Sequence, residues 1–556
     1  MNLRHILART KKKYLMAPLL GMGLLILTAA GDRYFEISKN IEIFTTLFKE
    51  LNTYYVDDVD PNKLMETGIE SMLASLDPFT NYITGADIDE YQLQTTGRYD
   101  GIGARIMKIG DYVVISEPYE GYPAQKAGLE AGDRILEIDG KSAKGYNTDQ
   151  VSELLKGQPS TELRLKIQKF DSDKIEDVII QRTEIKIYNV PYFGMLNDDI
   201  GYIKLDNFAE KAGQEVADAL KALKSDHPNI KGLIFDLRGN GGGLLNEAIN
   251  VANVFIDKGQ KIVYTKGKTS DANNEYTTMN KPIDTQIPLV VLIDGGTASA
   301  SEIVSGSIQD LDRGIVIGQN SYGKGLVQIT RPIAYKARLK VTTSKYYIPS
   351  GRCIQRIDYS HRNDEGKALA VADSLRKTFK TKGGRTVKDG AGIEPDITTE
   401  EQLLSDVTYS LFENNHIFNY ASSYKKNHPT LEGGEKFKMT DADFEAFLSY
   451  MKDKEYKYNT ETEAQVKKLK EIAEKEKYLT AIQPVITDLE SKISLDKEKD
   501  LIKHKDEVKR MLEMEIVSRY KYEKGRIAAS LKDDQDILKS YEYFSDILKY
   551  NKVLGK

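Results

Sequence analysis

The residue of this chain best placed for chemistry is a serine between a predicted strand and a predicted helix. Ser299 follows an apolar run over residues 289–293 and precedes a small-residue helical pattern over residues 303–308. A serine on such a corner is exposed, and the first amides of the helix point toward it, as a nucleophile and an oxyanion hole require. Ser299 and Glu302 also have the spacing of a capping box, which many non-catalytic helices carry. On this stretch alone both interpretations stay open.

A serine nucleophile needs a base beside it, and histidine is the usual one. None of the histidines lies in a glycine-rich corner of the region around Ser299. They are His5, His227, His361, His416, His428 and His504. A Ser–His–Asp triad is therefore weakly supported. The histidines also lack metal-ligand spacing, so we expect no metal site and no zinc hydrolase.

Lysine is the other candidate base. Lys324 stands between Gly323 and Gly325, directly before a predicted strand. Glycines at these positions let the backbone approach closely and let the lysine turn inward. To act as a base it must be neutral, so burial must lower its pKa from about 10.4 to about 7–8, at a cost of about 4 kcal/mol. The neutral side chain of Gln328 can orient the amine without holding it charged. A solvated loop lysine is the simpler interpretation of this motif alone.

A second strand–turn–helix corner spans residues 236–244. Three successive glycines, Gly241, Gly242 and Gly243, expose backbone amides at a helix N-terminus, which suits an oxyanion. A phosphate-binding loop is disfavoured because no Gly-Lys-Ser/Thr ending follows. A tight packing turn remains an alternative.

The elements that must position these corners alternate strand and helix over residues 187–400. The predicted strands are 200–203, 232–237, 289–293, 315–318 and pairs through 340–342, and the predicted helices are 212–223, 244–255 and the one after Ser299. This order predicts an α/β fold with crossover connections. Few apolar residues occur over residues 357–390, which we interpret as an exposed insertion.

Residues 97–186 have a different character. The run over residues 123–140 predicts a short helix, a glycine turn, a strand and an Asp-Gly turn, and it resembles a bacterial PDZ domain. The resemblance implies that Gly101, Ile102, Gly103 and Ala104 form the loop that binds a peptide carboxylate. The peptide would add to the sheet edge as a strand.

Composition narrows the class of protein. A chain of 556 residues predicts three or four domains, and a net charge of −5 gives no reason to expect nucleic acid as a partner. The single cysteine, Cys353, allows no intrachain disulfide and is interpreted as a packing residue.

The first 31 residues predict a signal peptide or a membrane anchor. Basic residues precede an apolar run over residues 15–30 that ends in small residues. The run is short for a spanning helix, which needs about 20 residues. We expect an exported protein, periplasmic or attached to the periplasmic face of the inner membrane.

Both flanks of the chain predict helices. Residues 32–96 show helical spacing of apolar side chains, and residues 401–556 are rich in Lys, Glu and Tyr. We favour a solvated helical satellite for the second region, while a partner-binding or oligomerising role stays open.

Together the motifs resemble the carboxyl-terminal processing peptidases, the tail-specific Ser–Lys proteases with a PDZ domain. The resemblance covers about residues 35–400. Its motifs are the helix end at 76–78, the PDZ run, 236–243, 297–302, 323–328 and 392–396. It implies a crotonase-like α/β protease core over 187–400 with an inserted PDZ domain over 97–186, an N-terminal helical region and a helical C-terminal extension. The third glycine at Gly241, the insertion and the extension depart from the family pattern.

The resemblance also implies the roles of the site residues. Ser299 would be the nucleophile, Lys324 the general base and Gln328 its orienter, with the amides of Ala300 and Gly242 as the oxyanion hole. The 25 residues between Ser299 and Lys324 match the family spacing and select Ser299 over Ser301. No cofactor is implied. The substrates would be proteins with free, apolar C-termini.

Two other functions remain as alternatives. A non-catalytic PDZ scaffold would need only the loop at residues 101–104. A crotonase-type acyl-CoA enzyme would share the core fold, but the leader and the PDZ run argue against it.

Overall fold

A computed structural model describes residues 34–497 and 499–556. The expected signal peptide or anchor over residues 1–31 lies outside the described residues. The chain divides into two compact units, residues 1–82 and 83–556. The described part of the first unit contains a helix over residues 34–54 and helix α2 (Pro61–Ala74), which begins at an Asp60 cap and a proline at its first position. Within the described ranges, no helix combines the length and apolarity that a membrane crossing requires.

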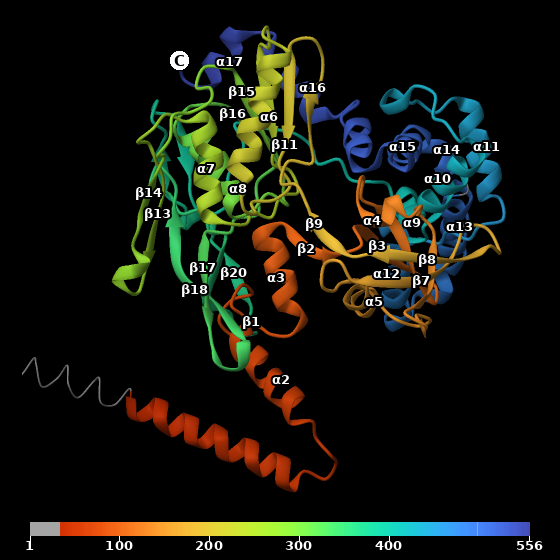
Figure 1. Ribbon diagram of the computed structural model, residues 1–556, viewed down its shortest axis with the longest axis horizontal. Coiled ribbons are helices and arrows are strands. Elements are labelled where there is room, and N and C mark those ends of the chain that lie inside the picture. The colour runs from red at the N-terminus through yellow and green to blue at the C-terminus, as the bar shows by residue number, and fades with distance from the viewer. Residues whose placement is uncertain (1–33, 498) are drawn as a thin grey trace, which may run out of the picture. The chain divides into compact units, whose positions relative to one another are not determined.

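The second unit is built on a six-stranded sheet (Figure 1). Its order is β10-β11-β12-β15-β16-β23, parallel except for β10. The strands are β10 (Tyr192–Met195), β11 (Ile200–Lys204), β12 (Gly232–Asp236), β15 (Leu289–Ile293), β16 (Ile315–Gly318) and β23 (Ile397–Thr398). β12 and β15 are buried throughout, as parallel strands covered on both faces must be. The α/β alternation expected over residues 187–400 is confirmed.

Three helices cover one face of this sheet. They are α6 (Ala212–Asp226), α7 (Leu245–Phe255) and α8 (Ala300–Asp310), and their apolar sides share one buried core with the strands. β12 and β15 are neighbours, so the turns that follow them lie side by side at the carboxyl edge of the sheet. These two turns carry the glycine corner and Ser299, at the edge where open α/β sheets bind ligands.

The C-terminal end of the chain covers the opposite face. Helices α16 (Gln535–Phe544) and α17 (Ile547–Val553) bury Ile537, Tyr543 and Tyr550 against Ile234 and Val290 of the sheet. The preference for a solvated satellite is therefore wrong for these two helices. An apolar sheet face must be covered, and a helix with one apolar side can do so from any distance along the sequence.

A second sheet joins β13 (Lys261–Gly267), β14 (Glu275–Thr277), β17 (Leu326–Pro332) and β18 (Arg338–Tyr347). β17 and β18 form a hairpin in which Gln328 pairs with Thr342. The predicted insertion at residues 357–390 forms two further hairpins with many exposed residues, β19–β20 and β21–β22. Their strands are Ile357–Arg362, Ala368–Ala370, Thr378–Lys380 and Thr386–Lys388.

The PDZ region has its own sheet, in the order β3-β4-β5-β7-β8, with β6 beside β5 and a separate β2–β9 ladder. The strands are β2 (Arg98–Gly101), β3 (Ala104–Ile109), β4 (Tyr112–Pro118), β5 (Arg134–Ile138), β6 (Lys141–Ser142), β7 (Glu162–Gln168), β8 (Ile175–Gln181) and β9 (Thr183–Lys186). Helices α4 (Pro123–Lys126) and α5 (Thr148–Leu155) complete it around a separate core. β3 is an edge strand.

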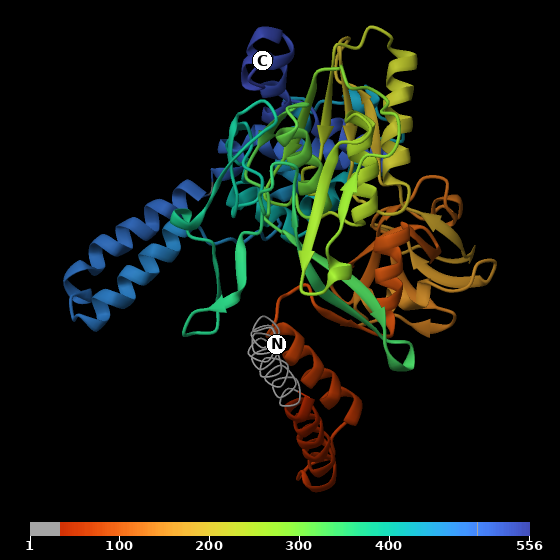
Figure 2. The ribbon, with the colours of Figure 1, turned by 90° about the vertical axis from the view of Figure 1, so that its left-hand side faces the viewer.

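Seven α-helices lie between β23 and α16 in the described residues, and all except the fourth and fifth share one buried core. They are α9 (Asp406–Glu413), α10 (His416–Asn427), α11 (Asp441–Met451), α12 (Glu461–Lys475), α13 (Leu479–Lys497), α14 (Asp500–Lys503) and α15 (Lys505–Ser530). α12 and α13 form a helical pair that projects from the other helices (Figure 2). α15 contacts the PDZ region through ion pairs that include Arg526–Glu117, at 2.9 Å.

Candidate active site

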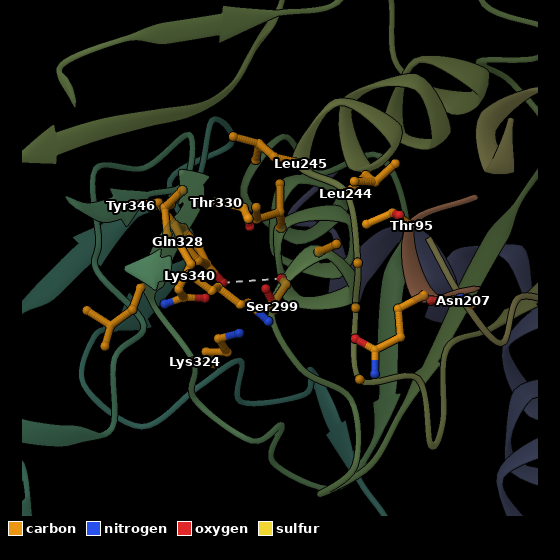
Figure 3. Close-up of a pocket in the computed structure, with 18 of the residues that line it drawn as sticks. Thr95, Asn207, Leu244, Leu245, Ser299, Lys324, Gln328, Thr330, Lys340 and Tyr346 are labelled. Atoms are coloured by element: carbon orange, nitrogen blue, oxygen red, sulfur yellow. Dashed lines mark hydrogen bonds between the residues drawn. The ribbon is translucent and has the colours of Figure 1, made fainter. Parts of the chain in front are cut away.

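The Ser299 corner and the glycine corner meet at a pocket of about 450 Å³ (Figure 3). Its lining comes from helix α3 (Ala86–Thr96), the glycine corner, the start of α8 and the β17–β18 hairpin, together with Asn207 after β11 and Lys324 before β17. The structure places five of the predicted site residues here, namely Ser299, Ala300, Lys324, Gln328 and Gly242. The PDZ loop at residues 101–104 is not part of the lining.

Ser299 occupies the sharp turn between β15 and α8. Its backbone has φ 56° and ψ −113°, a region that side chains other than glycine rarely adopt and that costs about 1–3 kcal/mol. The Tyr346 hydroxyl donates to its carbonyl oxygen at 3.2 Å, as Figure 3 shows. By contrast, Ser301 is buried, and its hydroxyl donates to the Asn240 carbonyl at 2.9 Å. Ser299, and not Ser301, lines the pocket.

The glycine corner lies directly against Ser299. A Cβ on Gly242, where φ is 99°, would lie 2.8 Å from the Ser299 Cβ and 2.9 Å from the Ala300 nitrogen, so only glycine fits. The Gly242 N–H donates to Asn240 Oδ1 at 2.8 Å. Asn240 is fully buried and also accepts the Ala298 N–H at 3.0 Å through its carbonyl oxygen. This one side chain and its backbone therefore join the two corners.

The two glycines beside Lys324 allow a close approach of two backbone segments. A Cβ on Gly323 would lie 2.5 Å from the Arg356 Cβ, and one on Gly325 would lie 2.8 Å from the Gln355 nitrogen. The predicted reason for these glycines is confirmed. Farther along the hairpin, Gln328 Nε2 donates to the Thr342 hydroxyl at 3.0 Å.

Glu302 links the turn that carries Ser299 to the loop that carries Lys324. Its side chain is fully buried, and its oxygens accept the Ser299 N–H at 2.8 Å and the Lys324 N–H at 2.9 Å. The same carboxylate accepts the Gly323 N–H at 2.7 Å and the Ser321 hydroxyl. Burial raises the pKa of this carboxyl, and the four hydrogen bonds oppose that rise. The capping-box spacing was the only sequence signal for Glu302, and it did not point to Lys324.

Arg238 anchors the glycine corner to the C-terminal helices. It pairs with the buried Asp236 at 2.7 Å and with Asp534 and Asp536 at the start of α16, at 2.9 Å each. Burial alone would raise the pKa of Asp236, but Arg238 and Lys204 outweigh it, so the pKa lies below its ordinary range. The C-terminal helices thus support the corner that carries Gly242.

The predicted carboxylate-binding loop lies in the PDZ region. Gly103 has φ 74°, and a Cβ there would lie 2.5 Å from the Tyr122 Cβ. The Ile102 carbonyl accepts the Ala124 N–H at 2.8 Å, and the loop leads directly into the edge strand β3. Among the described residues, β3 has no strand partner on its outer edge, and its Arg105 side chain pairs with Glu523 of α15.

Other reactive side chains are less well placed. None of the described histidines lines the pocket. Within the described ranges, no cluster of three or more His, Cys, Asp or Glu side chains is arranged to hold a metal ion. Cys353 is partly buried, and burial raises the pKa of its thiol, which fits a packing residue.

Three family models match the chain. Residues 199–361 match peptidase family S41, residues 114–169 match the PDZ domain, and residues 407–544 match the C-terminal helical domain of a probable PDZ-protease.

Named relatives agree with these matches. The carboxy-terminal-processing protease of Bartonella bacilliformis is 37% identical over 321 residues, which are 57% of this chain and 73% of that protein. A probable CtpA-like serine protease of Staphylococcus aureus is 33% identical over 364 residues, 63% of this chain and 71% of that protein. Among solved structures, the photosystem II D1 C-terminal processing protease shows 25% identity and a TM-score of 0.34, covering 65% of this chain and 93% of that one.

Proposed function

Because the chain belongs to peptidase family S41, among the carboxy-terminal-processing proteases with a PDZ domain, we propose that it is a serine endopeptidase with a Ser299–Lys324 dyad. The observation that carries the proposal is the pocket in which Ser299 and Lys324 meet, with the backbones of both held by Glu302. The alternative of a PDZ scaffold is not favoured, because it leaves this pocket and the strained Ser299 backbone without a role.

The proposed chemistry is acyl transfer. The neutral Lys324 amine takes the Ser299 hydroxyl proton as Oγ attacks a peptide carbonyl carbon. When the tetrahedral intermediate collapses, the C–N bond breaks, and the Lys324 ammonium gives its proton to the leaving amine. A water molecule then attacks the acyl carbonyl carbon while Lys324 takes a proton from it. The acyl C–O bond breaks, and the Lys324 ammonium returns the proton to Ser299 Oγ. Gln328, on β17 just after the loop that carries Lys324, would orient the amine.

Backbone amides would hold the negative charge of the intermediate. Ala300 is the first residue of α8, so its N–H belongs to the helix start that has no partner within the helix. Gly242 lies beside it, but its N–H donates to Asn240 Oδ1 in the state described. Gly242 can therefore serve as the second donor only after that hydrogen bond is exchanged.

The PDZ region would bind the C-terminus of the substrate. A peptide C-terminus can add to the open edge of β3, with its carboxylate on the amides of residues 101–104. We assign proteins with free, apolar C-termini as substrates. The basic and apolar segment over residues 1–31 supports exported or periplasmic substrates. The order of strands and helices supports a crotonase-like core.

The function is tested with the full chain and an unfolded protein that carries an apolar C-terminal tail. The unaltered enzyme should cleave it, and Ser299→Ala should abolish cleavage. Ser301→Ala should retain most of it, because the Ser301 hydroxyl donates to the Asn240 backbone carbonyl and lies outside the pocket lining. Products are followed by intact-mass spectrometry. Full activity of Ser299→Ala would refute the dyad, and tail binding without cleavage by the unaltered chain would favour the scaffold.

A further inference from the structure

Lys340 lies in the pocket but has no part in the proposed acyl transfer. In the β17–β18 hairpin, Thr330 pairs with Lys340 and Gln328 pairs with Thr342. Residues two apart on a strand share a face, so Gln328, Thr330 and Lys340 line the same side of the pocket (Figure 3). Lys340 lies about 7 Å farther along the hairpin than the Gln328 pair, at about 3.4 Å per residue.

Among the described residues, none provides a counter-ion for Lys340. Its side chain is partly buried, and its amine makes no hydrogen bond or ion pair with any residue in the ranges described. Burial lowers the pKa of this amine, and no carboxylate opposes the change. Desolvating an ammonium group without a partner is unfavourable, so most lysines keep theirs in water.

The pocket as a whole favours an anion. Among its described lining residues, the only basic side chains are Lys340 and Lys324, which the proposed mechanism keeps neutral, and no Asp or Glu is present. Arg338 adds a further positive charge near the outer end, where its guanidinium lies 5.9 Å from the centre of the Tyr91 ring.

Resting on the proposed endopeptidase function, we propose that Lys340 forms a subsite for a substrate carboxylate about two or three residues from the scissile peptide bond. An extended substrate lying along the hairpin would bring such a group to the amine. The carboxylate has two sources, the α-carboxylate of the substrate's own C-terminus or an Asp or Glu side chain. In either case the subsite adds a preference for negative charge to tail recognition by the PDZ domain.

The test compares matched peptides derived from one cleaved tail. One series carries Glu or Gln at each position within three residues of the cut, and a second ends at each of these positions as the free acid or the amide. The unaltered enzyme should favour one carboxylate form by about 10-fold or more in kcat/KM. Lys340→Met should bring this ratio to about 1. Lys340→Glu should instead favour a peptide that carries Lys at the same position. Lys345→Met, which removes an exposed lysine from the same strand, should leave the ratio unchanged.

The Glu/Gln series and the acid/amide series together identify the source of the carboxylate. The PDZ loop is the same in all variants, so any preference of the loop for a free C-terminus cancels when Lys340→Met is compared with the unaltered enzyme. A Lys340→Met enzyme that cleaves with unchanged Glu/Gln and acid/amide ratios would overturn the subsite while leaving the proposed function intact.

A second readout does not need cleavage. In Ser299→Ala, the favoured carboxylate peptide should protect Lys340 from reductive methylation, measured by peptide mass spectrometry, and its neutral counterpart should not. Protection without cleavage by the unaltered enzyme would support the subsite and refute the endopeptidase. Equal methylation with both peptides would refute the subsite.

Discussion

Replacing Lys324 by methionine is expected to lower kcat/KM for a tail-bearing protein by about 10²–10⁴-fold, the contribution of a well-placed general base. The thioether keeps most of the volume of the lysine but cannot accept the Ser299 proton. The backbone of residue 324 would still be held by Glu302, so the fold should be preserved. Initial rates over a range of substrate concentrations, with thermal unfolding as a check on folding, measure the effect.

Two control variants separate the role of base from the role of positive charge. Lys324→Arg keeps a cation that is not deprotonated in proteins, and it should be as inactive as Lys324→Met. Lys345→Met removes an exposed lysine outside the pocket and should retain activity. High activity in Lys324→Arg would mean that charge alone suffices, and the lysine would not be the base.

Replacing Glu302 by glutamine is expected to damage both stability and activity. Four donors converge on this buried carboxylate, and a glutamine would turn its NH₂ group toward some of them. Leaving buried donors without acceptors should lower the free energy of unfolding by about 2–4 kcal/mol. Because the carboxylate holds the backbones of both Ser299 and Lys324, kcat should fall by about 10²-fold, as expected for a misplacement of about 1 Å.

Ser321→Ala is the matched control for this effect. It removes one of the four donors but leaves the amides of Ser299, Gly323 and Lys324 bonded to Glu302. Denaturant titration and kcat should both change less than in Glu302→Gln. A Glu302→Gln enzyme with unaltered kcat would show that Glu302 does not position the dyad.

Local patterns were sufficient to predict the corners of the site. The strand over residues 289–293 is β15, as expected from an uninterrupted apolar run. The glycines beside Lys324 were correctly interpreted as points of close backbone approach. Such features can be predicted because they depend on the conformation of a few consecutive residues.

Contacts between distant segments could not be predicted in this way. Glu302 lies within one turn of Ser299, but its bond to the Lys324 amide depends on how the loop at residues 321–325 packs. Arg238 and Asp534 are 296 residues apart, and nothing in either local pattern indicates the ion pair. The helical spacing of Ile537, Tyr543 and Tyr550 indicates a buried side, but it does not identify the sheet that this side covers.

The central claim is that Ser299 is the nucleophile, and covalent trapping tests it most directly. A cleavage-competent preparation is treated with a fluorophosphonate in the presence of a tail peptide, digested and analysed by mass spectrometry for the modified residue. One adduct is expected, on Ser299, and it should form much more slowly in Lys324→Met. An adduct on Ser301 or on another serine, or full loss of cleavage with Ser299 unmodified, would contradict it.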